Sequence, residues 1–194
     1  TSFQVVNKLR GKIRKLHKIK KIKVGHAGTL DPLATGLLII CVGNKTKEIE
    51  LFQGQEKEYT GTFVIGATTP SFDLETEIEQ RFPVDTINES DLRNAVKILT
   101  GDIVQYPPVF SAVKIDGKIA YESARKGEEV KLRPRKVNIS KFEIDISEFP
   151  KVHFTIVCSK GTYIRSIASD FGKSLKNGAY LSSLRRQRIG EYSI

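Results

Sequence analysis

The order of the expected elements predicts an α+β protein with a mixed, largely antiparallel central sheet flanked by helices. Apolar patterns typical of strands are interrupted by segments with helical spacing, and the two kinds of element do not alternate strictly. This order disfavours a doubly wound parallel sheet. The chain has 194 residues, of which 39% are hydrophobic, which is enough for one sizeable domain with an ordinary core.

The first expected element is an amphipathic helix over Ser2 to Leu16. Thr1 or Ser2 is a suitable N-cap, because both side chains carry a hydroxyl oxygen. Apolar residues recur there at three- and four-residue spacing, at Phe3, Val6, Leu9, Ile13 and Leu16.

Basic residues crowd the outer face of this helix and the stretch that follows it, with nine lysines or arginines between Lys8 and Lys23. Two interpretations stay open: a solvated helix face, or a stripe that faces RNA. The net charge of +10 and the pI near 9.6 favour a polyanionic partner. Charge alone does not distinguish tRNA from DNA or a membrane surface.

The next elements follow from glycines and apolar runs. Gly25 to Gly36 is expected to be a loop, Leu37 to Val42 a buried strand, and Thr46 to Phe52 a short helix. Tyr59 to Gly66 alternates as a strand does, with Tyr59, Gly61, Phe63 and Ile65 on one side.

In the second half, helices and strands are again interleaved. Ser90 is expected to cap a helix to Leu99, the Pro107-Pro108 pair to be extended, and Ala120 to Lys126 to form a helix ended by Gly127. The remaining expected elements are strands at Arg135–Ile146 and Val152–Cys158, a helix at Gly161–Lys176, and short strands at Tyr180–Leu184 and Arg188–Ser193.

Composition narrows the location and the cofactors. Nothing resembles a signal peptide and no apolar run approaches the roughly 18 residues that cross a bilayer, so a cytoplasmic protein is expected. Cys41 and Cys158 lie in apolar segments, and two cysteines do not form a disulfide framework or a four-ligand metal set. We expect both to pack in the core and no metal to be bound.

The loop Gly25 to Gly36 holds the most informative residues, because its glycines surround one histidine and one aspartate. Such loops let the backbone approach a ligand closely. Asp31 precedes a proline, which biases it to an extended conformation. From these residues alone, a turn closed by Asp-Pro and a catalytic carboxylate are equally open.

The whole dodecamer, Gly25-His26-Ala27-Gly28-Thr29-Leu30-Asp31-Pro32-Leu33-Ala34-Thr35-Gly36, resembles the catalytic motif of TruB-type bacterial tRNA pseudouridine synthases. Four further segments resemble the same family in the same order, so that the likeness covers nearly the entire chain: Lys57–Tyr59, Pro107–Lys114, Cys158–Arg165 and Gly178–Arg186. The resemblance implies the pseudouridine synthase fold, with residues 1–194 as the catalytic domain.

The activity that this resemblance implies is the isomerisation of uridine to pseudouridine at position 55, in the T loop of tRNA, after the base is flipped out. It implies no cofactor, and as partner the tRNA T stem-loop without an obligatory protein or a membrane. Asp31 acts first, by covalent attack on the ribose or base or by taking the ribose 2′ proton. The sequence leaves these routes open.

The resemblance also assigns roles around Asp31. Arg165 is the cation beside the carboxylate, and Tyr59 is the aromatic residue that stacks on the uracil, with its hydroxyl near the departing C5 proton. Tyr163 and Leu184 line the uracil pocket, and His26 contacts the RNA as a binding residue. Lys114 and Lys160 are candidates for phosphate contacts, and Arg185 and Arg186 follow the pocket leucine.

The chain departs from the family pattern in three places. Where the family has Thr-Asp-Thr-x-Asp, this sequence has Thr69-Pro70-Ser71-Phe72-Asp73 and keeps the last carboxylate only. A strand ending in Lys-Pro-x-Gly, expected before Thr1, is absent from the sequence. So is the C-terminal RNA-binding (PUA-like) domain of roughly 70 residues.

Three other functions remain as alternatives. A related synthase guided by a separate RNA is disfavoured by Leu33-Ala34-Thr35 and by the absence of the C-terminal domain. A non-catalytic RNA-binding protein would not need Asp31, Tyr59 and Arg165 together. A basic protein unrelated to RNA would not match five ordered motifs.

Overall fold

The computed structural model describes residues 1–110, 114–115, 118–119 and 132–194. Its helices are α1 (Ser2–Leu16), the 3-10 helix η1 (Gly43–Glu48), α2 (Ile49–Gly54), α3 (Glu89–Ile98) and α5 (Ile164–Ser174). Its strands are β1 (Val24–His26), β2 (Thr35–Gly36), β3 (Ile40–Val42), β4 (Lys57–Ile65), β5 (Ala67–Thr68), β6 (Gln80–Arg81), β7 (Gly101–Gln105), β8 (Lys114–Ile115), β9 (Lys118–Ile119), β10 (Arg135–Asp145), β11 (Lys151–Cys158), β12 (Ala179–Ile189) and β13 (Tyr192–Ser193).

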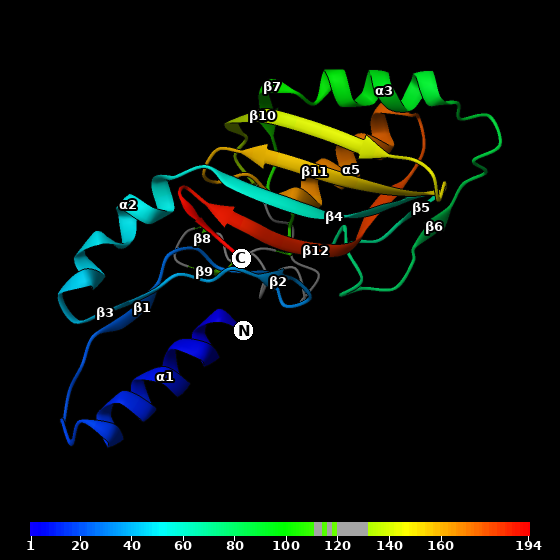
Figure 1. The fold of residues 1–194 in the computed structure, drawn as a ribbon. Helices are drawn as coiled ribbons and strands as arrows, with labels where there is room; N and C mark the ends of the chain where they lie inside the picture. The colour runs from blue at the N-terminus through cyan, green and yellow to red at the C-terminus, as the bar shows by residue number, and fades with distance from the viewer. Residues whose placement is uncertain (111–113, 116–117, 120–131) are drawn as a thin grey trace.

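A seven-stranded sheet organises the molecule, in the order β13-β12-β4-β11-β10-β7 (Figure 1). All pairs along this path are antiparallel, and β2 adds to β12 as a parallel partner. The predicted α+β class with a mixed, largely antiparallel sheet is therefore confirmed.

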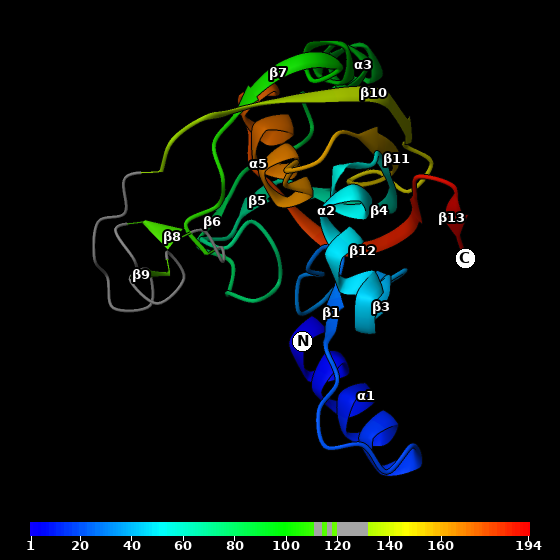
Figure 2. The same ribbon diagram turned by 90° about the vertical axis from the view of Figure 1, so that its left-hand side faces the viewer.

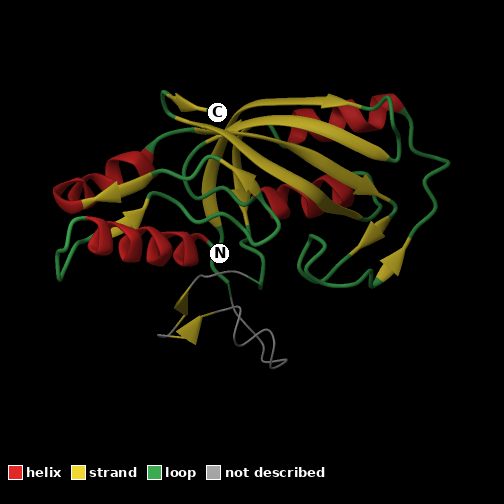
Figure 3. Cartoon of the chain, turned by 60° about the horizontal axis from the view of Figure 1, so that its bottom comes forward, coloured by secondary structure: helices red, strands yellow, loops and turns green. Residues whose placement is uncertain are grey.

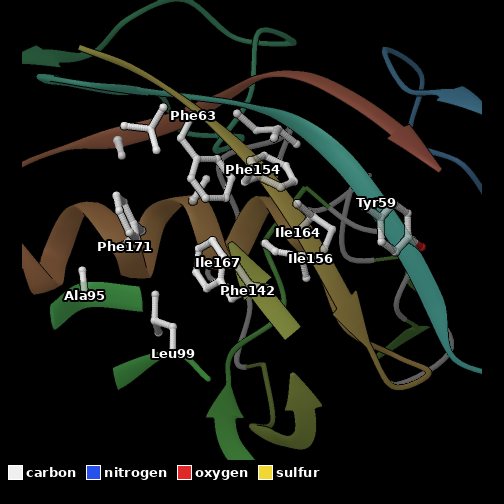
Figure 4. Close-up of a cluster of buried hydrophobic side chains, with 14 of the residues drawn as sticks. Tyr59, Phe63, Ala95, Leu99, Phe142, Phe154, Ile156, Ile164, Ile167 and Phe171 are labelled. Atoms are coloured by element: carbon white, nitrogen blue, oxygen red, sulfur yellow. The ribbon is translucent and has the colours of Figure 1, made fainter. Parts of the chain in front are cut away.

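Helices α3 and α5 pack against one face of this sheet and close the core (Figures 1 and 4). Phe63 on β4 stacks on Phe154 of β11 with ring centroids 4.3 Å apart, and Phe171 of α5 lies 5.7 Å from Phe63. A Cβ at Gly61 would lie 2.6 Å from the Phe154 ring. Glycine at this position therefore makes room for the aromatic stack.

The C-terminal strand differs from its prediction. One continuous strand, β12, replaces the two short strands expected at Tyr180–Leu184 and Arg188–Ser193, and only Tyr192–Ser193 forms a separate strand. Residues 185–187, which are polar, lie between the two expected strands. In the structure the pairing of β12 with β4 continues through them, with register shifts at two points.

Several boundaries in the N-terminal half were also wrong. Only Ile40–Val42 of the expected Leu37–Val42 strand is a strand, and it pairs with β1 alone in a half-buried two-stranded ribbon. The short helix expected at Thr46–Phe52 is the 3-10 helix η1 followed by α2. Figure 3 shows this ribbon between α1 and α2.

The remaining helices begin at other residues than expected. Asn88, and not Ser90, caps α3, because its side chain accepts from the Asp91 amide while the Asp91 carboxylate accepts from the Asn88 amide. Helix α5 begins at Ile164, three residues after the expected start, because Gly161 has a φ of +82°. The helix expected at Ala120–Lys126 lies outside the described residues.

Helix α1 confirms its prediction and projects from the sheet (Figures 1 and 2). Thr1 forms a capping box with Gln4. Val6 is buried, but Phe3 and Leu16 are exposed, so the predicted apolar stripe is covered only in part. The buried Ser2 hydroxyl accepts the Leu30 amide at 3.0 Å, which ties the start of α1 to the loop that holds Asp31.

Both cysteines are free and buried, as predicted. Burial raises the pKa of the Cys158 thiol to about 11, so that it stays protonated at neutral pH. Within the described part of the chain, no helix is long and apolar enough to span a bilayer.

Candidate active site

A cavity of about 810 Å³ lies where four segments meet: β4, β12, the start of α5, and the loop of residues 27–34 between β1 and β2, which we call the Asp31 loop. Asp31, Tyr59, Tyr163, Arg165 and Leu184 all line it. The structure thus brings together five of the six predicted site residues, from segments as far apart as the loop at residue 31 and the C-terminal strand. A volume of this size is typical of small-ligand pockets.

Asp31 and Arg165 form a two-point ion pair at this cavity. The Arg165 Nε donates to Asp31 Oδ2 at 3.1 Å and the Nη2 donates to Oδ1 at 3.0 Å. The arginine side chain is only 3% exposed, whereas that of Asp31 is 32% exposed. The fork fixes the direction of the carboxylate, while the exposed side of Asp31 stays open to a ligand.

A second carboxylate, that of Asp73, lies against the same arginine. Its Oδ2 is 3.6 Å from Arg165 Nε, and its side chain is 5% exposed. Arg165 also donates to the Ser71 carbonyl at 3.2 Å. Arg165 lies in the first turn of α5, where the helix dipole disfavours a cation, so these acceptors on two loops offset that cost and hold the side chain in place.

Arg186 holds the Asp31 loop in place through hydrogen bonds to the main chain. It is fully buried and donates to three main-chain carbonyls, those of Leu37 at 2.8 Å, Gly28 at 3.1 Å and Thr29 at 3.3 Å. A Cβ at Gly36, which has a φ of +104°, would lie 2.3 Å from the Arg186 carbonyl oxygen. Glycine lets the loop approach β12 closely enough for these bonds.

Tyr59 lies opposite Arg186 in the β4–β12 register, and both side chains are buried. Figure 4 shows Tyr59 at one end of the apolar cluster, with its hydroxyl pointing away from the other labelled side chains. Burial raises the pKa of Tyr59 to about 12, against the opposing effect of the Arg186 cation. The phenol is therefore protonated at neutral pH and is a hydrogen-bond donor as well as an apolar wall.

Two hydrogen bonds to its main-chain groups fix the position of Tyr163. The Gln105 side chain accepts from the Tyr163 amide at 2.7 Å and donates to the Tyr163 carbonyl at 3.1 Å. The Arg135 guanidinium lies over the Tyr163 ring, 5.8 Å from its centroid. Gln105 is itself buried, so it fixes the cavity wall directly before α5.

Two lysines line the cavity in different ways. Lys57 is buried and donates to the Gln53 carbonyl at 2.6 Å and to the Gln55 carbonyl. Burial lowers the pKa of Lys57, and the nearby Arg186 adds to this effect. Lys160 is exposed at the rim, where an ammonium group can meet a phosphate.

Other predicted residues lie elsewhere. His26, the sixth, ends β1 with a half-buried ring and is not among the described residues that line the cavity. Burial lowers the pKa of His26, and Arg186 contributes to the lowering. Arg186, which follows the pocket leucine Leu184 in the matched motif, bonds to the loop carbonyls and is a structural residue. Arg185 is exposed, and the Lys114 side chain lies outside the described part.

Sequence reasoning missed Asp73, Gln105 and the buried state of Arg186. The signal for Asp73 was the single carboxylate retained in the altered loop. For Gln105 there was none, since a glutamine at the end of a strand is ordinary. The described residues contain no group of three or more histidine, cysteine or acidic side chains placed to hold a metal ion.

The fold and the site together define an enzyme pocket in which a cation-held carboxylate faces an aromatic wall, an arrangement suited to a planar base that has left its stack. A model of the family described as TruB family pseudouridylate synthase (N terminal domain) matches residues 14–164. The chain therefore belongs to the TruB family of pseudouridylate synthases.

Similar proteins agree with this assignment. The chain is 57% identical to a tRNA pseudouridine synthase B of Flavobacterium johnsoniae, over all of this chain and 85% of that protein. It is 53% identical to a protein of the same name from Parabacteroides distasonis, over all of this chain and 83% of that protein. A crystal structure of a Cbf5-Nop10-Gar1 complex aligns with a TM-score of 0.68 at 26% identity, over 96% of this chain. This chain spans 46% of that one.

Proposed function

We propose that residues 1–194 form a catalytic domain that isomerises a uridine to pseudouridine in the T loop of tRNA, at position 55. The observation that carries the proposal is the Asp31 carboxylate, held by Arg165 at two points and open to a cavity walled by Tyr59 and Tyr163. The names of the relatives support tRNA as the substrate. The protein acts in the cytoplasm without an obligatory protein partner.

The reaction keeps every atom of the substrate. The bond from ribose C1′ to uracil N1 breaks, the base turns within the pocket, and a bond from C1′ to C5 forms. The C5 proton then leaves, and N1 ends with a proton. No oxidant, reductant or external group is needed, so side chains that hold the base and move protons suffice.

Each side chain has a distinct part in this scheme. Asp31 attacks the ribose or base, or takes the ribose 2′ proton, and Arg165 orients it through the two-point contact. The Tyr59 ring contacts the flipped uracil, and its neutral hydroxyl lies where the C5 proton is released. Tyr163 and Leu184 provide the remaining walls, replacing the stacking that the base has lost. His26 is a contact for the RNA outside the cavity.

The test is pseudouridine formation on an unmodified tRNA transcript, compared between this chain and Asp31→Asn. The substitution keeps the shape of the side chain but removes its charge and its basicity. We expect product from the unaltered protein, none from Asp31→Asn, and similar tRNA binding by both. A transcript with cytidine at position 55 should yield no product with either protein.

Two outcomes would contradict the proposal. Product from Asp31→Asn at the unaltered rate would remove Asp31 from the mechanism. Binding of tRNA without any product from either protein would leave an RNA-binding relative, or a synthase that needs a separate guide RNA, as the better account.

A further inference from the structure

Helix α1 presents a surface that the active site does not use. Residues 1–30 contain nine lysines or arginines and no aspartate or glutamate. The buried side of α1 is marked by Ser2 and Val6, and Arg10 reaches back to donate to the Val24 carbonyl at 3.0 Å. The rest of the basic residues on α1 are exposed.

Gly11 lies on the exposed side of α1, midway along the helix. On an α-helix its surface neighbours are the residues three and four positions away, which are Asn7, Lys8, Arg14 and Lys15. All four are exposed. A Cβ built at Gly11 meets nothing within 4 Å, so packing does not require glycine there, although glycine in a helix interior is destabilising.

At Gly11 the helix backbone is therefore not covered by a side chain, and the surrounding side chains can donate hydrogen bonds. Lys8, Arg14 and Lys15 supply three positive charges, and Asn7 keeps its amide NH₂ free for donation because its Oδ1 accepts from Arg10. Without a side chain at position 11, an anionic backbone can approach the helix closely. We call Asn7, Lys8, Gly11, Arg14 and Lys15 the Gly11 patch.

We propose that the Gly11 patch binds the sugar–phosphate backbone of the tRNA stem next to the target uridine. Phosphates are the groups that surface lysines and arginines contact when they position a nucleic acid without reading its bases. Phe3 and Leu16 on α1 are exposed, so an anionic lipid surface is the alternative partner that the vesicle experiment below tests.

The position of α1 suits this role. Its first turn is joined to the Asp31 loop by the bond from the Leu30 amide to Ser2 Oγ, and the helix runs outward from there for about 22 Å (Figures 1 and 2). RNA whose base occupies the cavity therefore has its adjoining backbone within reach of α1. The proposal rests on the proposed function for the identity of the RNA.

The first experiment compares two triple variants that lose the same charge. One, K8A/R14A/K15A, empties the Gly11 patch, and the other, R93A/K97A/K176A, removes three exposed cations on α3 and after α5, at the far end of the molecule (Figure 1). Binding to an unmodified tRNA transcript is measured by fluorescence anisotropy over a range of salt concentrations. This readout does not depend on turnover.

For the patch variant, we expect the dissociation constant near 0.15 M salt to rise at least about tenfold, and the slope of log affinity against log salt to become shallower by about 3, as three lost phosphate contacts require. The control variant should stay within about twofold of the unaltered protein. At saturating tRNA the rate of pseudouridine formation should be unchanged in both, so that KM rises and kcat does not.

A second pair of variants separates binding from folding. Gly11→Gln and Gly11→Glu add side chains of equal size at a position with open space, and both residues form helices better than glycine. Both should raise the Tm by about 2–4 °C. Gly11→Gln should weaken tRNA binding, because its side chain covers the bare helix. Gly11→Glu should weaken tRNA binding further, because its carboxylate repels phosphate and pairs with Lys15 four residues on.

The outcomes distinguish this inference from the proposed function. Equal tRNA affinity for the patch and control triples, or unaltered tRNA affinity in both Gly11→Gln and Gly11→Glu, would overturn the role of the patch even if pseudouridine is made. Patch-dependent binding to vesicles of phosphatidylserine and phosphatidylcholine, with tRNA binding unaltered, would also overturn it in favour of a lipid surface. Failure of the proposed function would appear instead as absence of product with affinity still dependent on the patch.

Discussion

Replacing Arg165 with methionine tests whether one buried cation organises the active site. Methionine has a similar length and no charge. The change removes both bonds to Asp31, the bond to the Ser71 carbonyl and the contact with Asp73. Asp31 is partly exposed and can be solvated, but the Asp73 side chain is 5% exposed and cannot.

The expected loss of stability in Arg165→Met comes from the Asp73 carboxylate, which stays buried. Removing one partner of a buried ion pair costs about 3–5 kcal/mol, because Asp73 stays buried without its cation, although its Oδ1 still accepts from the Glu75 amide at 3.0 Å. For a chain of this length, that corresponds to a fall in Tm of roughly 6–20 °C. Arg165→Lys keeps the charge but not the planar fork, so we expect about 1–3 kcal/mol together with a large loss of activity.

Urea denaturation and single-turnover pseudouridine formation measure the two effects separately. Arg185→Met is the matched control, since Arg185 is exposed and its loss should change stability by less than about 0.5 kcal/mol. Adding Asp73→Asn to Arg165→Met should recover part of the lost stability, because the unpaired charge disappears. If Arg165→Met is as stable as Arg185→Met, or if the second change recovers nothing, the account of a buried charge cluster is wrong.

Three further predictions follow from the cavity walls. Gly36→Ala should lower stability by about 2–5 kcal/mol, from a positive φ and a Cβ that would overlap the Arg186 carbonyl, as thermal denaturation would show; no change would mean that the loop tolerates displacement. Because the pKa of Tyr59 is about 12 in the folded protein and near 10 when unfolded, the unfolded state loses its proton first as pH rises. The wild type should therefore lose about 1.4 kcal/mol per pH unit relative to Tyr59→Phe between pH 10 and 12 and nothing below pH 9, and an activity limb below pH 9 that vanishes in Tyr59→Phe would contradict this. Gln105→Leu should cost about 1–3 kcal/mol and lower kcat/KM by loosening Tyr163, and unchanged values of both would show that the two main-chain bonds are dispensable.

The fold class could be predicted because periodicity is local. The spacing of apolar residues in α1, β4, β10 and β11 appears in the sequence whatever packs against them. Strand ends at β12 could not be predicted in the same way, because Arg185, Arg186 and Gln187 resemble a polar break. Only the pairing with β4 and the carbonyls of the Asp31 loop make a buried arginine possible at position 186.

In the candidate site, too, some residues could be predicted from the sequence and others could not. Asp31, Tyr59 and Arg165 stand in recognisable motifs, and the structure brings their side chains to one cavity. Asp73 and Gln105 act through contacts made over 58 residues or more, to Arg165 and to the Tyr163 main chain. Such partners leave no periodic or motif signal, because either residue type is ordinary at the surface of a loop or the end of a strand.

The buried side chains around the cavity also determine its balance of charge. Arg165 lies between two carboxylates, Asp31 and Asp73, so the trio carries a net negative charge if taken alone. Arg186 and Lys57 are buried nearby and satisfy their hydrogen bonds on main-chain carbonyls. Their charges are therefore not neutralised by those bonds. Both lie among the residues that line the cavity, as do Asp31 and Arg165, so they offset the excess negative charge of the trio. In the proposed reaction Asp31 approaches an RNA whose backbone repels it, and these cations within the same pocket offset that repulsion.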